Sequence, residues 1–138
     1  MKKIFNLLFF ICIVHSSFAT DFKYPSKTKK IVKEFNTTSD VTMNVTNSYG
    51  NITVLLWDQK KIEYTVDITV AANTDKKTTD LLNNITVDFE QSNNSVSATT
   101  VFKRSLSGNK QMEINYTIKI PKNAMANVSQ KYGKVNIN

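Results

Sequence analysis

The sequence predicts an all-β protein: an antiparallel sheet or sandwich with one short helix, leading into a β-solenoid-like repeat at the C-terminus. Three observations predict this class. Two long segments alternate apolar and polar residues, one short segment has the features of a capped helix, and a strand, corner and strand pattern occurs twice. The chain has 138 residues, 41% of them hydrophobic, which is enough for one domain with its own core.

The two long alternating segments are the strongest indication of β structure. From Ile62 to Ala72 every second residue is apolar, and the opposite positions from Lys61 to Thr69 hold charged residues or threonine. The same alternation returns from Met112 to Ile120 and stops at Pro121, which has no backbone N–H to donate. Alternation over this length predicts long strands with one buried and one wet face.

Shorter elements fill the rest of the chain. A helix is expected over Asp75–Asn84, because Thr74 is a favourable N-cap and Leu81, Leu82 and Ile85 give one apolar edge. Further strands are expected from short apolar runs bounded by turn residues. These runs are Ile31–Phe35, Val41–Thr46, Asn51–Trp57, Ile85–Glu90 and Val96–Phe102.

The first nineteen residues have the layout of a secretory signal peptide. Lys2 and Lys3 precede the apolar run Ile4–Val14, and Ser17 and Ala19 stand at the small-residue positions of a cleavage site. The run is shorter than the roughly 20 residues that span a bilayer. We therefore expect residues 1–19 to be removed on export, to the periplasm or the cell surface, with no transmembrane segment in the mature chain.

The rare reactive residues lie in that leader. Cys12 is the single cysteine and His15 the single histidine. A mature chain without either excludes nucleophilic catalysis with a histidine base and zinc sites built on cysteine or histidine. No Asp-x-Asp cluster for calcium and no glycine-rich phosphate loop occurs. The sequence therefore predicts a protein that is not an enzyme, with no catalytic residue, no cofactor and no metal.

Carboxylate pairs leave one enzymatic alternative. Asp88 and Glu90 are two residues apart on the polar side of one expected strand, and Glu63 and Asp67 share a face of another. A glycosidase needs only two acids about 5–10 Å apart. A polysaccharide-cleaving enzyme of β-helical architecture is therefore the third hypothesis, although acids at alternate strand positions are also typical of a solvated sheet face.

An internal repeat relates two distant segments. Asn44–Val54 aligns with Asn127–Ile137 at an offset of 83 residues, with four of the eleven positions identical. Two of the three glycines, Gly50 and Gly133, hold the same place in it and predict a sharp corner between two strands. The preceding tyrosine of each copy is expected to cover the corner backbone.

These features together resemble the N-terminal part of the bacterial putative-adhesin family, a group of exported β-repeat domains of largely unknown function. The resemblance is carried by the segment Tyr49–Trp57, the Leu-Leu helix, the strand Asn115–Pro121 and the second Tyr-Gly pair. It implies that the second pair opens a run of solenoid turns and that the chain is truncated. The expected division is a signal peptide (1–19), a basic segment with the first strand (20–40) and an adhesin-like domain incomplete at its C-terminus (41–138).

The leading functional hypothesis is a non-enzymatic, exported, adhesin-like interaction or structural module of the cell envelope. Its expected partner is an envelope or surface protein or a glycan, bound by Trp57, Tyr49 and Tyr132 or by the open C-terminal strand edge. The alternative is a carbohydrate or anionic-polymer binding domain that adds Lys27, Lys29 and Lys30 to these aromatic residues. Nucleic acid is not expected, because the chain is exported and holds a single arginine.

Overall fold

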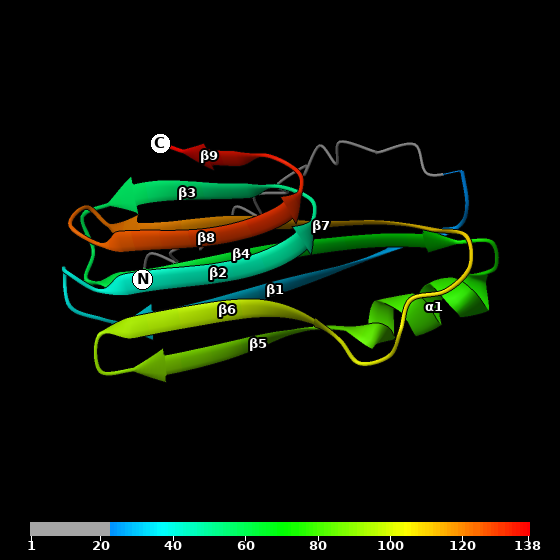
Figure 1. The fold of residues 1–138 in the computed structure, drawn as a ribbon, viewed down its shortest axis with the longest axis horizontal. Coiled ribbons are helices and arrows are strands. Elements are labelled where there is room, and N and C mark those ends of the chain that lie inside the picture. The colour runs from blue at the N-terminus through cyan, green and yellow to red at the C-terminus, as the bar shows by residue number, and fades with distance from the viewer. Residues whose placement is uncertain (1–22) are drawn as a thin grey trace, which may run out of the picture.

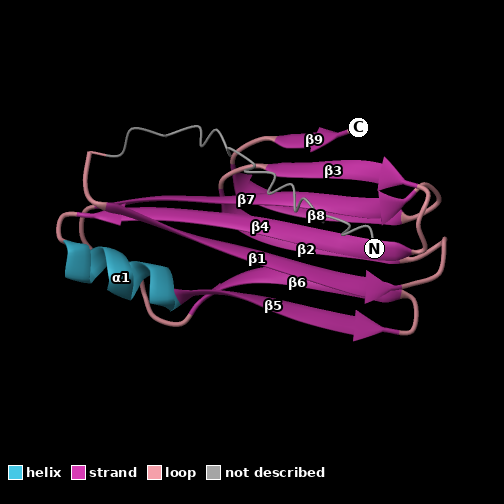
Figure 2. Cartoon of the chain, turned by 180° about the vertical axis from the view of Figure 1, so that it is seen from behind, coloured by secondary structure: helices cyan, strands magenta, loops and turns pink. Residues whose placement is uncertain are grey.

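The computed structural model describes residues 23–138, which form two β-sheets and one helix (Figures 1 and 2). The predicted signal peptide lies outside these residues. The elements follow one another in the order β1 (Ser26–Asn36), β2 (Thr42–Tyr49), β3 (Ile52–Trp57), β4 (Lys61–Ala72), α1 (Asp75–Asn84), β5 (Ile85–Ser92), β6 (Ser95–Phe102), β7 (Lys110–Pro121), β8 (Met125–Tyr132) and β9 (Val135–Ile137). No helix among the described residues is long and apolar enough to cross a membrane.

The two sheets lie face to face and enclose the core. One sheet has the strand order β1-β4-β7-β3-β9 and the other β5-β6-β2-β8. The alternating strands supply the core as predicted. Their apolar positions are buried, apart from the half-buried Met112: Ile62, Tyr64, Val66, Ile68 and Val70 on β4, and Ile114, Tyr116, Ile118 and Ile120 on β7. The helix α1 packs on β4 and β1 at one end of the sandwich, as Figure 1 shows.

The predicted helix is confirmed in its bounds and in its cap. Thr74 has an extended backbone, and its side chain accepts a hydrogen bond from the Lys77 N–H at 3.3 Å. Thr78 is fully buried, and its hydroxyl hydrogen bonds to the backbone of Ala72 and Pro25. The helix is therefore fixed to the sheet by a polar contact as well as by Leu81.

The prediction of an antiparallel architecture is wrong for four of the seven strand pairs. β1 with β4, β4 with β7 and β5 with β6 are antiparallel, but β2 pairs in parallel with β6 and β8, and β3 pairs in parallel with β7 and β9. The chain crosses from one sheet to the other at each corner. Successive passes therefore run in the same direction, and the sheets are mixed.

Three strand pairs stack as successive coils: β6 with β7, β2 with β3, and β8 with β9. Thr42 pairs with Met125 and Ile52 with Val135, so the structural register of the upper two coils is the 83-residue offset of the sequence repeat. The two repeat segments are thus equivalent in space. A longer run of solenoid turns is not formed by residues 23–138.

The lowest coil, formed by β6 and β7, has a longer corner than the other two. Thr46 pairs with Thr99, an offset of 99 − 46 = 53, whereas Ile52 pairs with Tyr116, an offset of 116 − 52 = 64. The corner between β6 and β7 therefore holds 64 − 53 = 11 more residues than the corner between β2 and β3. These residues form the loop 103–109 and the start of β7, beside α1.

Candidate interaction surface

The corners of the upper coils stack directly on each other, and each requires glycine. Gly50 has φ +106° and Gly133 has φ +136°, a region that other residues rarely adopt. A Cβ on Gly50 would lie 2.7 Å from the Ile114 carbonyl carbon, and one on Gly133 would lie 2.7 Å from the Gly50 carbonyl carbon. The backbones of β7, the first corner and the second corner are therefore in contact, with no room for a side chain.

Equivalent side-chain amides fasten the two corners. Asn47 donates from Nδ2 to the carbonyls of Tyr49 and of Ile114, in the layer below, at 3.0 and 2.8 Å. Gln130, its counterpart in the upper coil, donates from Nε2 to the carbonyls of Tyr132 and of Gly50, each at 2.7 Å. Its Oε1 is the one buried side-chain nitrogen or oxygen atom in residues 23–138 that lacks a hydrogen-bond partner.

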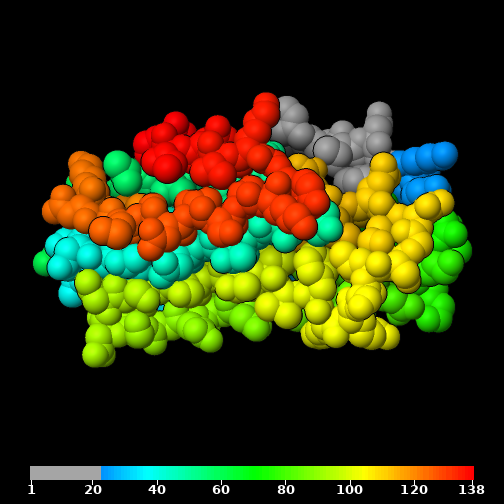
Figure 3. Space-filling view, viewed as in Figure 1, coloured from blue at the N-terminus to red at the C-terminus, as the bar shows by residue number. Residues whose placement is uncertain are grey.

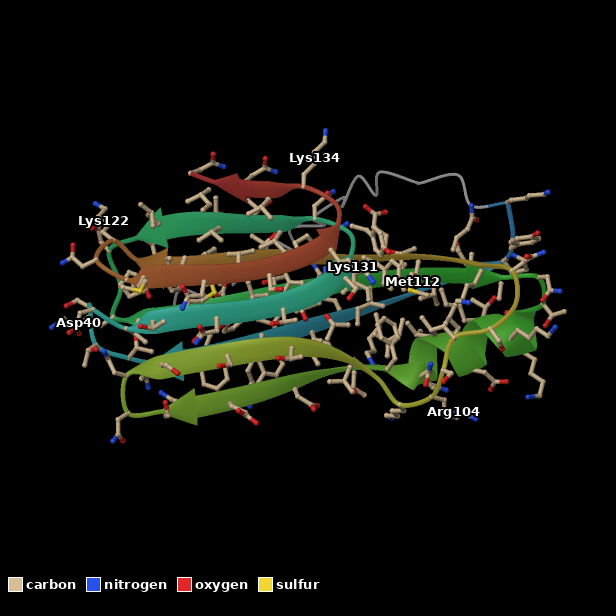
Figure 4. All side chains as sticks on the ribbon, viewed as in Figure 1. Asp40, Arg104, Met112, Lys122, Lys131 and Lys134 are labelled. Atoms are coloured by element: carbon tan, nitrogen blue, oxygen red, sulfur yellow. The ribbon has the colours of Figure 1, made fainter. Side chains whose placement is uncertain are left out.

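A second ladder runs through the residue after each corner. The Asn115 Oδ1 accepts from the Asn51 N–H at 2.8 Å, and the Asn51 Oδ1 accepts from the Lys134 N–H at 2.9 Å. Lys134 occupies the next place and carries only donors. Figure 4 shows this lysine at the upper corner. The side-chain ladder therefore ends at the upper coil.

Tyr49 and Tyr132 lie together at these corners. Their rings stack with centroids 5.6 Å apart and an interplanar angle of 26°. Tyr49 also meets Phe102 edge to face at 5.9 Å, so it is held between two rings, while Tyr132 is 54% exposed. Only the upper tyrosine presents most of its surface to solvent.

β8 and β9 form the open edge of the two sheets, which runs along the upper rim of the molecule in Figure 3. Large apolar side chains are exposed there: Met125, Val135 and Ile137, together with Tyr132. The Lys134 carbonyl accepts from the Ile52 N–H at 2.9 Å, and the Asn138 N–H donates to the Val54 carbonyl at 3.0 Å. In a parallel pair the alternate residues, Val135 and Ile137, direct their N–H and C=O groups away from the partner. Among residues 23–138 the outward backbone groups of β9 therefore have no strand partner.

Trp57 lies at the opposite end of β3 from the tyrosines. Its ring is half-buried, and its Nε1 donates to the Lys61 carbonyl at 2.9 Å. The ammonium groups of Lys61 and Lys119 lie 5.8 and 5.4 Å from the ring centroid. A hydrogen bond from Lys119 to Glu63 holds the pKa of that carboxyl below its usual value. The structure therefore separates Trp57 from Tyr49 and Tyr132.

The three predicted basic residues lie on two faces of β1. Lys27 donates to Asp75 at 3.0 Å and to Thr79 at 2.7 Å, both on α1, and Lys29 donates to the Ile85 carbonyl at 3.2 Å. Lys30 points to the other face and pairs with Asp67 at 3.4 Å. All three ammonium groups therefore have partners within the protein.

The predicted acidic pairs are also placed apart from any enclosed site. Asp88 and Glu90 are exposed on β5, an edge strand. Glu63 and Asp67 lie on the outer face of β4 and form ion pairs with Lys119 and Lys30. Within residues 23–138 no three acidic, histidine or cysteine side chains gather closely enough to hold a metal ion.

One concave site was not predicted from the sequence. A pocket of about 430 Å³ lies between α1 and the loop 103–110, and it is lined by Lys77, Arg104 and Lys110 among others. The lining residues come from two segments about 25 positions apart, with no shared motif. The only signal in the sequence is the Ser-Gly-Asn turn at 107–109 beside the single arginine.

Fold and surface together define a two-sheet β protein built on stacked coils, with an open strand edge. No family model matches the sequence, and no curated protein matches it. The fold is similar to that of a putative cell adhesion protein from Clostridium sporogenes ATCC 15579, with a TM-score of 0.51 and 14% identity over 80% of this chain and 51% of that one.

Two further solved structures match less well. One is a putative adhesin from Bacteroides fragilis NCTC 9343, with a TM-score of 0.43 and 14% identity over 79% of this chain and 42% of that one. The other is a putative adhesin from Parabacteroides distasonis ATCC 8503, with a TM-score of 0.46 and 14% identity over 83% of this chain and 40% of that one. The chain thus spans about half the length, or less, of these proteins.

Proposed function

We propose that this protein is a non-enzymatic, exported, adhesin-like module of the cell envelope that acts by pairing its open β8–β9 edge with other β-strands. The edge carries the proposal: it combines unpaired backbone groups with the exposed side chains of Met125, Tyr132, Val135 and Ile137. An exposed apolar edge strand is a template for pairing with another chain. The fold shared with a putative cell adhesion protein supports the same role.

The occupant that the structure favours is a second copy of the same kind of strand, corner and strand unit. The face below shows which contacts such a unit makes: β8 and β9 stack on β2 and β3 through parallel pairing, tyrosine stacking and amide hydrogen bonds. In a second copy the lower face of every coil is covered by its own strands, so two copies would meet through their upper faces. The upper face repeats the tyrosine and the corner glycine. Two copies of the chain are therefore expected to associate through this edge.

The test is the oligomeric state of the purified protein, measured by light scattering after size-exclusion chromatography over a range of concentrations. Val135→Pro removes an outward N–H without removing a bond to β3, and we expect it to abolish association. Val135→Thr keeps the N–H and the β-branched shape, and it is the matched control. A protein that stays monomeric at every concentration, or loses association equally in both variants, would contradict edge pairing.

A further inference from the structure

One wall of the pocket beside α1 comes from residues that the other two corners lack. The two upper corners reverse the chain around a single glycine, whereas the corner between β6 and β7 contains 11 additional residues. This insertion, together with the α1 residues from Lys77 to Asn84, forms the walls of the pocket. Figure 3 shows the loop atoms (yellow) against the helix (green) at one end of the molecule. Loops carried on a rigid scaffold are where binding residues concentrate.

A buried side chain fixes the loop in place. Asn84 is 6% exposed, and both ends of its amide bind the backbone of Arg104: Nδ2 donates to the carbonyl at 3.0 Å, and Oδ1 accepts from the N–H at 2.8 Å. The Asn84 carbonyl also accepts from the Lys103 N–H at 3.0 Å. Arg104 is thus held beside α1 by its backbone, as Figure 4 shows, and its guanidinium takes no part in this anchoring.

The charge of the lining is unbalanced. Lys77, Arg104 and Lys110 all line the pocket, and none of them has an acidic partner within 4.0 Å in the described part of the chain. The one acid in the lining, Asp80, is already paired with Lys76 at 2.9 Å. Three cations without counter-charges around one concavity favour an anionic ligand.

The remaining lining indicates which kind of anion fits. Leu81 and Leu106 give an apolar floor, while asparagine and serine side chains of the loop supply hydrogen-bonding groups. A volume of about 430 Å³ lies within the roughly 300–1,000 Å³ of small-molecule sites. We propose that this pocket binds a hydroxylated carboxylic acid of the size of one or two sugar units, and that Arg104 binds its carboxylate. A planar guanidinium suits a carboxylate because it forms two parallel hydrogen bonds.

Isothermal titration calorimetry of the purified protein tests this site with three probes: digalacturonic acid, the neutral disaccharide galactobiose, and galactose 6-phosphate. We expect digalacturonic acid to bind and galactobiose to bind much more weakly. Arg104→Gln should weaken digalacturonic acid binding by about tenfold or more, because it removes a charge-assisted bidentate contact. Lys103→Gln is the matched control: it removes the same charge from the neighbouring exposed residue, which does not line the pocket.

Each other outcome overturns the proposal. If digalacturonic acid at about 10 mM gives no heat of binding, the pocket is not a site for this class of ligand. Equal losses of affinity in Arg104→Gln and Lys103→Gln would show a general effect of charge. Binding of galactose 6-phosphate in place of digalacturonic acid would assign the pocket to phosphate. Unchanged thermal unfolding of both variants shows that the fold is intact. Val135→Pro should leave this binding unchanged, so the pocket and the strand edge fail or succeed independently.

Discussion

The stacked corners give the sharpest prediction about stability, and Gly50→Ala tests it. Two costs add at this position. Holding an alanine at φ +106° costs about 1–3 kcal/mol, and forcing its Cβ against the Ile114 backbone adds about 1–3 kcal/mol, because backbone atoms cannot rotate away. We therefore expect Gly50→Ala to lower the free energy of unfolding by about 2–6 kcal/mol.

Gly108 provides the matched control within the same chain. It also has a positive φ, +76°, but a Cβ built there meets no atom within 4 Å. Gly108→Ala therefore carries only the backbone cost, about 1–3 kcal/mol. Urea unfolding followed by circular dichroism measures both changes, and thermal midpoints should separate by several degrees. Equal losses of stability in the two variants would refute the claim that backbone contact between coils requires glycine at position 50.

Two further changes test other parts of the structure. Burial raises the pKa of Tyr116 from its ordinary 10.0 to about 12, so the folded chain keeps this proton between those values while the unfolded chain loses it. The contribution of Tyr116 to stability should fall by about 1.4 kcal/mol per pH unit between pH 10 and 12, in addition to that of Tyr64, whose pKa burial also raises. Urea unfolding from pH 9 to 11 should therefore show a shallower fall in Tyr116→Phe. Lys134→Asn restores a side-chain acceptor at the upper corner and should tighten self-association several-fold by light scattering; an unchanged dissociation constant would exclude a role for the ladder at the edge.

The sequence predicted the elements well because alternation reports which face of a strand is buried. Lys61–Ala72 was predicted with its bounds, and the helix was predicted with its cap. The first strand was predicted too short, as Ile31–Phe35 instead of Ser26–Asn36. Its extra inward positions hold Lys27 and Lys29, which reach α1 and β5 with their ammonium groups, so the apolar pattern is interrupted where the strand continues.

The sequence predicts which face of each strand is buried better than it predicts which strands lie side by side. Alternation places Val45 and Ile52 in the core but does not say which strands lie beside them, and the expectation of antiparallel pairing followed the commoner case. The 83-residue repeat contained the missing information. Two segments of the same pattern, crossing between the same two sheets, stack in parallel when they are adjacent, and their offset in sequence is then their register.

The pocket could not be predicted from a single sequence. The 11-residue insertion is visible only as a difference between two strand registers, 53 in one sheet and 64 in the other, and these registers exist only in the folded chain. The same comparison of registers explains which corner of the fold can hold additional residues. The Gly50 corner lies between the backbones of Ile114 and Gly133, and the Gly133 corner lies directly on Gly50. Among the described residues the corner between β6 and β7 has no coil beneath it, and it accommodates a loop. Variation that changes the ligand is therefore expected at residues 103–109, and variation at Gly50 and Gly133 is expected to change stability and pairing.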